Sequence, residues 1–181
     1  MKKLNALCLL ISITQFGLTQ TNDSLISGTT IKVSFIDRHL DQFDTITVYF
    51  YKESTEDGLV KGFFQDDTIA KMDVTWYGEM GKTTVHYYFE HDSLFYAFEQ
   101  NFNYNRPIYM DQKKAKEMGD STVFDPSLTI VKEHFYYFID QMLVLYLDEH
   151  KKEVDLSLGT NTLIGSGLIT DSNDKKKLLI E

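Results

Sequence analysis

The sequence predicts an α+β fold that is mainly β: an antiparallel meander of about seven strands with an N-terminal helix and one or two short helices packed on it. The first observation is a repeated aromatic phrase, YYFEHDSL from Tyr87 to Leu94 and YYFIDQML from Tyr136 to Leu143. The second is that polar pairs interrupt runs of aromatic and β-branched residues. The third is that helical signals are confined to the two ends of the chain and one internal segment.

Each copy of the phrase predicts a β-hairpin whose polar pair forms a two-residue loop. The loop of the first copy is His91-Asp92, and both residue types tolerate positive φ angles better than most. Because strand side chains alternate between two faces, we expect three cross-strand pairs on the core face: Phe89 with Leu94, Tyr87 with Tyr96, and Val85 with Phe98. The opposite face should then collect the remaining pairs: Glu90 with Ser93, Tyr88 with Phe95, and His86 with Ala97.

The same construction applies at two other places in the chain. A loop at Asp140-Gln141 gives two pairs, Phe138 with Leu143 and Tyr136 with Leu145, and a loop at Asp66-Asp67 pairs Phe64 with Ile69. The three phrases begin at Gly62, Tyr87 and Tyr136, which are 25 and 49 residues apart. The second spacing is close to twice the first, which indicates an inserted segment, residues 100–131.

Further strands and turns complete the meander. The run TITVYFY, residues 45–51, alternates apolar and polar positions, and a turn at Asp57-Gly58 follows it. Gly78 and Gly81 mark the bend between the next two strands.

Helical signals occur in three segments. Residues 29–43 place four side chains at helical spacing: Ile31, Phe35, His39 or Leu40, and Phe43. The candidate caps before them are Ser27 and Thr29. In the insertion, Asp111 and Gly119 bracket a two-turn helix as its N-cap and C′ residues. After Asp155 the pattern weakens, and the chain forms either a short helix near Leu168 to Leu179 or a partly disordered tail.

The N-terminus has the pattern of an export signal. Lys2 and Lys3 precede a mostly apolar stretch that ends at Phe16, which is too short to span a bilayer. Small residues place signal cleavage near Thr19, and Cys8 lacks the small preceding residue of a lipid-anchor motif. The predicted organisation is a signal peptide (1–19), an N-terminal extension (20–27), a β-meander domain with its N-terminal helix (28–155) and a C-terminal tail (156–181). The predicted location is the periplasm or the extracellular space.

Charge and cysteine content exclude several classes of protein. The formal net charge is −9 at pH 7, and removal of two lysines with the signal changes it to −11. Nucleic acid and anionic lipid require clustered Lys and Arg, whereas the one basic run here, residues 175–177, is short and follows two aspartates. The mature chain is also predicted to contain no cysteine. We therefore expect no nucleic-acid partner, no transmembrane anchor and no cofactor, and the sequence does not indicate an oligomeric state.

Two catalytic interpretations are available and neither is preferred. His86, Glu90 and His134 are imaginable as a metal site, although a solvated His beside an acid is the simpler interpretation. Four acids surround the inserted helix and would suit a hydrolase if they lined a cleft: Asp111, Glu117, Asp120 and Asp125. We favour solvated loop acids, so no residue is predicted to be catalytic or to bind a metal.

The second face of the predicted sheet is unusually aromatic. It is expected to carry Tyr88, Phe95, Phe135, Tyr137 and Tyr146. A sheet with one wet face should not carry this many aromatic residues there, so this face is either covered by helices or binds a partner. We expect residues 28–43 to cover most of it and leave a rim of tyrosines for recognition. The predicted binding residues are Tyr88, Phe95, Tyr137 and Tyr146.

Three stretches, YYFEHDSLFYAFE, NFNYNRPIY and YYFIDQMLVLYLDE, carry a family resemblance. From about Thr45 to Glu149 the chain resembles small exported bacterial proteins with aromatic-rich β-hairpins, and it is loosely similar to the tyrosine-rich hairpin meanders of MORN repeats. It lacks the regular glycines of MORN repeats. The resemblance implies a β-meander fold and an export route, and it brings no catalytic residues with it.

The sequence thus leaves two hypotheses about function. The first is a non-enzymatic envelope protein that binds a protein, peptide or glycan through its aromatic sheet surface or the 100–131 insertion. The alternative is a carboxylate-dependent hydrolase that acts in the cell envelope.

Overall fold

The computed structural model describes residues 22–51 and 56–180, and the chain divides into two compact units, residues 1–38 and 39–181. The described part of the first unit is a single helix over residues 22–38. It includes residues that were expected to precede it, and the predicted caps Ser27 and Thr29 lie inside it. The hydroxyl of Ser27 donates to the Ser24 carbonyl three residues back instead of capping an end. The predicted signal peptide and its cleavage site near Thr19 lie outside the described residues.

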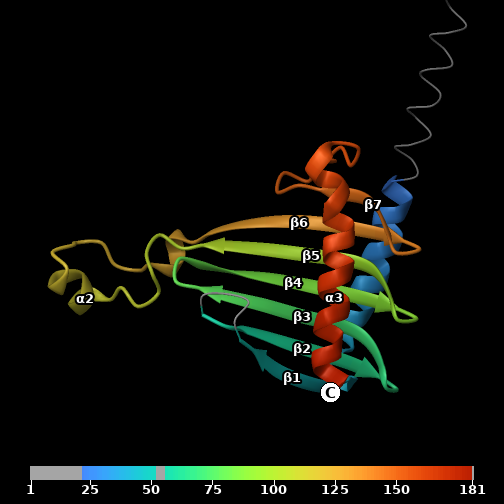
Figure 1. Ribbon diagram of the computed structural model, residues 1–181, viewed down its shortest axis with the longest axis horizontal. Coiled ribbons are helices and arrows are strands. Elements are labelled where there is room, and N and C mark those ends of the chain that lie inside the picture. The colour runs from blue at the N-terminus through green and yellow to red at the C-terminus, as the bar shows by residue number, and fades with distance from the viewer. Residues whose placement is uncertain (1–21, 52–55, 181) are drawn as a thin grey trace, which may run out of the picture. The chain divides into compact units, whose positions relative to one another are not determined.

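The second unit is built on one seven-stranded sheet (Figure 1). Its strands are β1 (Asp44–Phe50), β2 (Gly58–Gln65), β3 (Thr68–Gly78), β4 (Gly81–Glu90), β5 (Ser93–Asn103), β6 (Ile130–Ile139) and β7 (Met142–Leu147). Their order in the sheet is their order in the chain, and all neighbours are antiparallel. A short 3₁₀ turn, η1 (Leu40–Gln42), precedes β1. The predicted antiparallel meander of about seven strands is confirmed.

Three hairpins share one turn geometry. Both residues of each predicted loop have positive φ angles: 48° and 63° at Asp66-Asp67, 50° and 62° at His91-Asp92, and 48° and 59° at Asp140-Gln141. Two successive left-handed residues form a type I′ turn, whose twist matches that of the flanking strands. The polar pairs of the repeated phrase are therefore the loops, as the sequence predicted.

Each of these hairpins also contains a β-bulge, which the sequence did not predict. The pairs nearest the turns have the predicted register: Phe64 with Ile69, Phe89 with Leu94, and Phe138 with Leu143. One step further from the turn the register shifts, so one residue of the returning strand is left without a partner residue. The extra residues are Ala70, Phe95 and Val144.

The bulges correct several predicted pairs. Tyr87 lies opposite Ala97, and Tyr96 lies opposite Tyr88, although Tyr87 and Tyr96 were expected to face each other. The other pairs beyond the bulges are Val85 with Glu99, His86 with Phe98, and Tyr136 with Tyr146. One inserted residue puts every later side chain on the opposite face. Tyr96 and Phe98 therefore lie on the face opposite the predicted core face, and Tyr146 lies on the core face.

One face of the sheet, called here the helix face, is covered by the C-terminal helix α3 (Ile164–Ile180), which crosses the strands (Figure 1). A 3₁₀ segment, η3 (Gly159–Leu163), leads into this helix, which is longer than the short helix that was expected. The core lies between the helix and the sheet and includes Val60, Met72, Val74, Tyr87 and Leu179. A Cβ at Gly62 would lie 2.6 Å from a methyl carbon of Leu179, so this glycine lets the helix approach the sheet.

Most of the predicted insertion, residues 104–129, is an excursion between β5 and β6 that projects beyond the end of the sheet, whereas residues 100–103 and 130–131 belong to the flanking strands (Figure 1). It contains α2 (Gln112–Glu117) and a 3₁₀ turn, η2 (Pro126–Leu128). The Asp111 carboxylate caps α2 by accepting from the Lys114 backbone N–H at 2.8 Å, and Gly119 follows the helix with a φ of 70°. Both predicted ends of this helix are confirmed. None of the described helices is long and apolar enough to cross a membrane.

Candidate functional site

Two rows of aromatic side chains run across the face opposite α3, called here the aromatic face. In the first row, ring centroids lie 5.6 Å apart between Tyr88 and Tyr96 and 5.1 Å apart between Tyr96 and Tyr137. In the second, the His86 ring stacks on Phe98 at 5.6 Å and Phe98 stacks on Phe135 at 5.2 Å. Each row follows the cross-strand register, so the pairing of β4, β5 and β6 builds a continuous aromatic surface.

The four predicted binding residues do not form one group. Tyr88 and Tyr137 are only 3% and 5% exposed, and Phe95, the bulge residue of β5, is half-buried. Tyr146 is paired with Tyr136 and packs against the core of the helix face, so its predicted place on the aromatic face is wrong. The role of Tyr88, Phe95 and Tyr137 in binding stays a prediction.

The imagined metal site is not formed. His86 lies on the aromatic face, where its Nδ1 is 2.6 Å from a carboxylate oxygen of Asp73. Glu99 pairs with Val85 on one side and with His134 on the other. Because paired residues share a face of the sheet, His134 lies with Val85 on the helix face. Among the described residues, no group of three His, Cys, Asp or Glu side chains is arranged to hold a metal ion.

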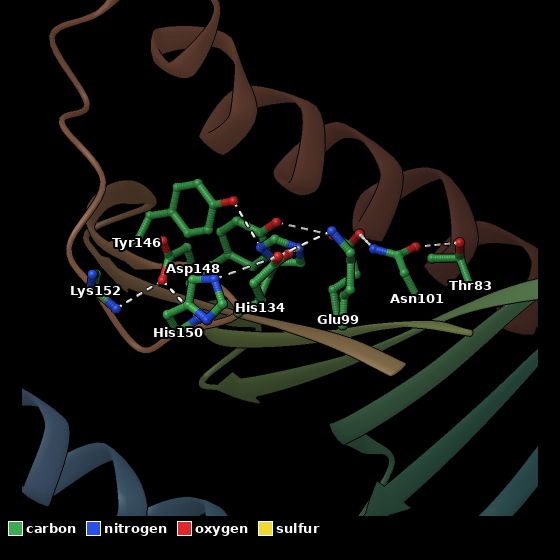
Figure 2. A network of polar contacts seen from close by, with 11 residues as sticks. Thr83, Glu99, Asn101, His134, Tyr146, Asp148, His150 and Lys152 are labelled. Carbon is green, nitrogen blue, oxygen red and sulfur yellow. Dashed lines mark hydrogen bonds and ion pairs between the residues drawn. The ribbon is translucent and has the colours of Figure 1, made fainter. Parts of the chain in front are cut away.

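A polar network on the helix face was not predicted from the sequence (Figure 2). Thr83 Oγ1 donates to Asn101 Oδ1 at 2.7 Å, and Asn101 Nδ2 donates to Glu99 Oε1 at 2.6 Å. The hydroxyl of Tyr136 donates to the other oxygen of Glu99 at 3.0 Å. These residues come from three different strands and meet only through the register, which explains why a linear pattern could not reveal them.

The network continues towards β7 through a histidine. The hydroxyl of Tyr146 lies 2.9 Å from His134 Nδ1, and His134 Nε2 lies 4.0 Å from a carboxylate oxygen of Glu149 (Figure 2). Lys132 Nζ is 3.1 Å from the other oxygen of the same carboxylate. Burial, followed by the Glu99 carboxylate, raises the pKa of Tyr136 far above its usual value, so this hydroxyl is a fixed hydrogen-bond donor.

A second polar link ties α3 to the sheet. The hydroxyl of Tyr87, which is 1% exposed, donates to Asp171 Oδ2 at 2.6 Å. Asp171 also lies 3.7 Å from Lys175 Nζ, and that ammonium group sits 4.4 Å from the ring centroid of Phe50. Burial and the neighbouring Asp171 carboxylate raise the pKa of Tyr87 well above its usual value. The contact therefore anchors the helix and is structural.

The acids of the insertion hold its own backbone in place. Asp111 caps α2, Asp120 accepts from the Thr122 N–H and pairs with Arg106, and Asp125 accepts from the Ser127 N–H at 2.8 Å. These bonds lower the pKa values of Asp120 and Asp125. The general acid of a glycosidase needs a raised pKa, so Asp120 and Asp125 are poorly suited to that role.

The insertion is also held together by its own contacts. Asn105 bridges its two limbs, since Nδ2 donates to the Val123 carbonyl and Oδ1 accepts from the Asp125 N–H, both at 3.0 Å. The rings of Tyr104 and Phe124 pack edge to face at 5.3 Å. Despite this internal order, several large apolar side chains face solvent: Ile108, Tyr109, Met118, Leu128 and Ile130. A segment that is fixed in shape and exposes apolar side chains is typical of a binding element.

A comparison with protein-family models, curated proteins and solved structures finds no match to this chain.

Proposed function

We propose that this chain is a non-enzymatic binding protein of the cell envelope that recognises a partner protein through the 100–131 insertion. The proposal rests on one observation: the insertion is internally bonded and projects from the sheet, yet it exposes Ile108 at 52% and Met118 at 63% of their surfaces. Isolated exposed apolar residues are common in proteins, but this group is gathered on one protruding segment.

The composition of the insertion supports a protein partner rather than a glycan. Its exposed side chains include Ile, Met and Leu, which contribute to binding mainly by leaving water, and the single exposed tyrosine, Tyr109, already has its hydroxyl 3.5 Å from Glu79. Met adapts its shape to different apolar surfaces. The complementary surface would be an apolar groove on the partner.

The export route is part of the same proposal. It is supported by Lys2 and Lys3 followed by the apolar stretch that ends at Phe16. Mass spectrometry of the protein recovered from cell fractions tests it. We expect the periplasmic or secreted form to begin close to residue 20; a full-length chain that stays in the cytoplasm would contradict export.

The binding proposal is tested by capture from envelope extract with two matched double variants. Ile108→Ser with Met118→Ser removes apolar side chains from the insertion. Ile139→Ser with Met142→Ser removes the same residue types, at 49% and 64% exposure, from the β6–β7 turn at the other end of the sheet. We expect the insertion variant to capture at least about tenfold less partner than the unaltered chain, the equivalent of about 1.4 kcal/mol. The control variant should capture as much partner as the unaltered chain. Equal capture by both variants would refute the proposal.

A further inference from the structure

A hollow of about 570 Å³ lies at the end of the sheet where β3, β4 and β5 meet. Its lining includes Trp76, Thr83, Asn101 and Asn103. Small-molecule sites in proteins have volumes of about 300–1,000 Å³, so this space is of the right size for a ligand. Its lining does not include Ile108 or Met118 of the insertion, although Glu79 in its wall lies 3.5 Å from the hydroxyl of Tyr109.

The register explains why a hollow forms here. Trp76, Thr83 and Asn101 lie side by side in one row of the helix face, and the next row towards the sheet end is formed by Gly78, Gly81 and Asn103. The two glycines leave that row without side chains on β3 and β4. A Cβ at Gly81 would lie 2.0 Å from the Phe102 carbonyl oxygen, so β5 approaches this position too closely for any residue other than glycine.

The polar groups beside the hollow are held in fixed orientations. The Asn101 amide accepts from Thr83 and donates to Glu99, which itself accepts from Tyr136 (Figure 2). These bonds use one of the two amide hydrogens of Asn101 and one of its two acceptor positions, so the amide can still donate and accept. A preorganised amide of this kind loses little entropy when a ligand binds.

An aromatic ring completes the lining. Trp76 packs edge to face against Phe50 at 6.1 Å, and Lys175 Nζ lies 5.7 Å from its ring centroid, but the side chain is only half-buried and contributes to the wall of the hollow. The charged lining residues are one acid and one base, Glu79 and Lys82, so the hollow has no excess of positive charge for a phosphate group.

We propose that this hollow binds a neutral saccharide. A sugar ring offers an apolar C–H face that stacks on an aromatic ring, and hydroxyl groups that donate and accept hydrogen bonds at the same time. Trp76 supplies the stacking surface, and Asn101, Thr83 and Asn103 supply paired donors and acceptors. The inference goes beyond the proposed partner-protein binding and does not depend on it.

The experiment uses the fluorescence of Trp76, the single tryptophan of the chain, as a reporter placed in the hollow itself. The full mature chain is titrated with three neutral tetrasaccharides built from N-acetylglucosamine, from α-linked glucose and from β-linked glucose. We expect at least one of them to cause a saturable change in the emission. Asn101→Ala should weaken that binding at least tenfold, and Asn173→Ala, an exposed asparagine on α3, should bind like the unaltered chain.

A second variant separates loss of binding from loss of structure. Asn103 is an exposed lining residue, so Asn103→Ala should keep the unfolding midpoint and still weaken binding at least threefold. The proposal is overturned if none of the three sugars saturates the signal below about 10 mM, or if all these asparagine variants bind equally well. The variant Ile108→Ser with Met118→Ser should bind sugar normally, so failure of this proposal and failure of the partner-protein proposal give different results.

Discussion

The two ends of the sheet differ in how their strands are connected. At one end, three type I′ turns, each followed by the same bulge, join β2 to β3, β4 to β5, and β6 to β7. At the other end the two fully described connections differ: the bend between Gly78 and Gly81 is two residues long, and the connection between β5 and β6 is an ordered excursion with its own helix. The projecting insertion and the hollow beside Trp76 both lie at this second end.

The difference separates the architecture of the protein from its proposed function. The repeated turn and bulge fix strand order and register, and their apolar pairs, such as Phe89 with Leu94, belong to the core. The irregular end contributes less to the core and exposes more apolar surface, as expected where loops carry binding.

The largest contrast is expected between two leucine truncations. Leu94, at the repeated end, is 5% exposed, whereas Leu128, in the insertion, is 57% exposed. Leu94→Ala should lower the free energy of unfolding by about 2–5 kcal/mol, since it leaves a cavity in the core. Leu128→Ala should change it by less than about 0.5 kcal/mol. Denaturant unfolding measures the free energy of unfolding of both variants. Equal losses in the two variants would contradict the proposed difference between the two ends of the sheet.

High pH should destabilise the folded protein through two buried tyrosines of the helix face. The folded protein keeps Tyr87 and Tyr136 protonated, because burial and nearby carboxylates raise their pKa values, whereas the unfolded chain releases these protons near pH 10. The folded state therefore holds more protons above pH 10, and stability is full below that pH and falls as pH rises through it. The slope should approach about 1.4 kcal/mol per pH unit for each such tyrosine. Unfolding curves between pH 8 and 12 that do not move would contradict this account.

The anchor of α3 should have an intermediate effect. Tyr87→Phe keeps the ring and removes the hydroxyl that donates to Asp171, so it should lower the free energy of unfolding by about 1–3 kcal/mol. Tyr49→Phe is the matched control, because Tyr49 is 65% exposed, and it should change stability by less than about 0.5 kcal/mol. A Tyr87→Phe chain as stable as this control would show that the bond contributes nothing.

The smallest effect concerns the repeated turn. Asp140 and Gln141 have φ angles of 48° and 59°, which glycine and asparagine adopt with less strain. Replacing them with Asn-Gly should raise the free energy of unfolding by about 0.5–1 kcal/mol. The same replacement at Asn161-Thr162, which lies in the 3₁₀ segment η3 and outside the hairpins, should give no gain. A loss of stability at the hairpin would contradict a type I′ turn at Asp140-Gln141.

The sequence predicted the strand order, the three loops and the ends of α2, because these depend on local turn and cap chemistry. It did not predict the bulges, and this error placed Tyr96 and Tyr146 on the wrong faces. Both faces are aromatic, so a shift by one residue replaces one aromatic side chain with another and leaves no signature in the pattern. The network of Thr83, Asn101, Glu99 and Tyr136 was missed for a related reason: its members become neighbours only after β4, β5 and β6 pair.

The proposed function requires that the insertion binds a partner and that the sheet folds without the insertion. Asn103 and Ile130 are paired at the end of β5 and β6, so an Asn-Gly turn between them can replace residues 104–129. The most direct measurement is partner capture by this shortened chain, with its unfolding free energy measured alongside. We expect capture to fall at least about tenfold while stability stays within about 1 kcal/mol of the unaltered chain, since shortening a long loop lowers the entropy cost of closing it. Undiminished capture by the folded, shortened chain would contradict the claim.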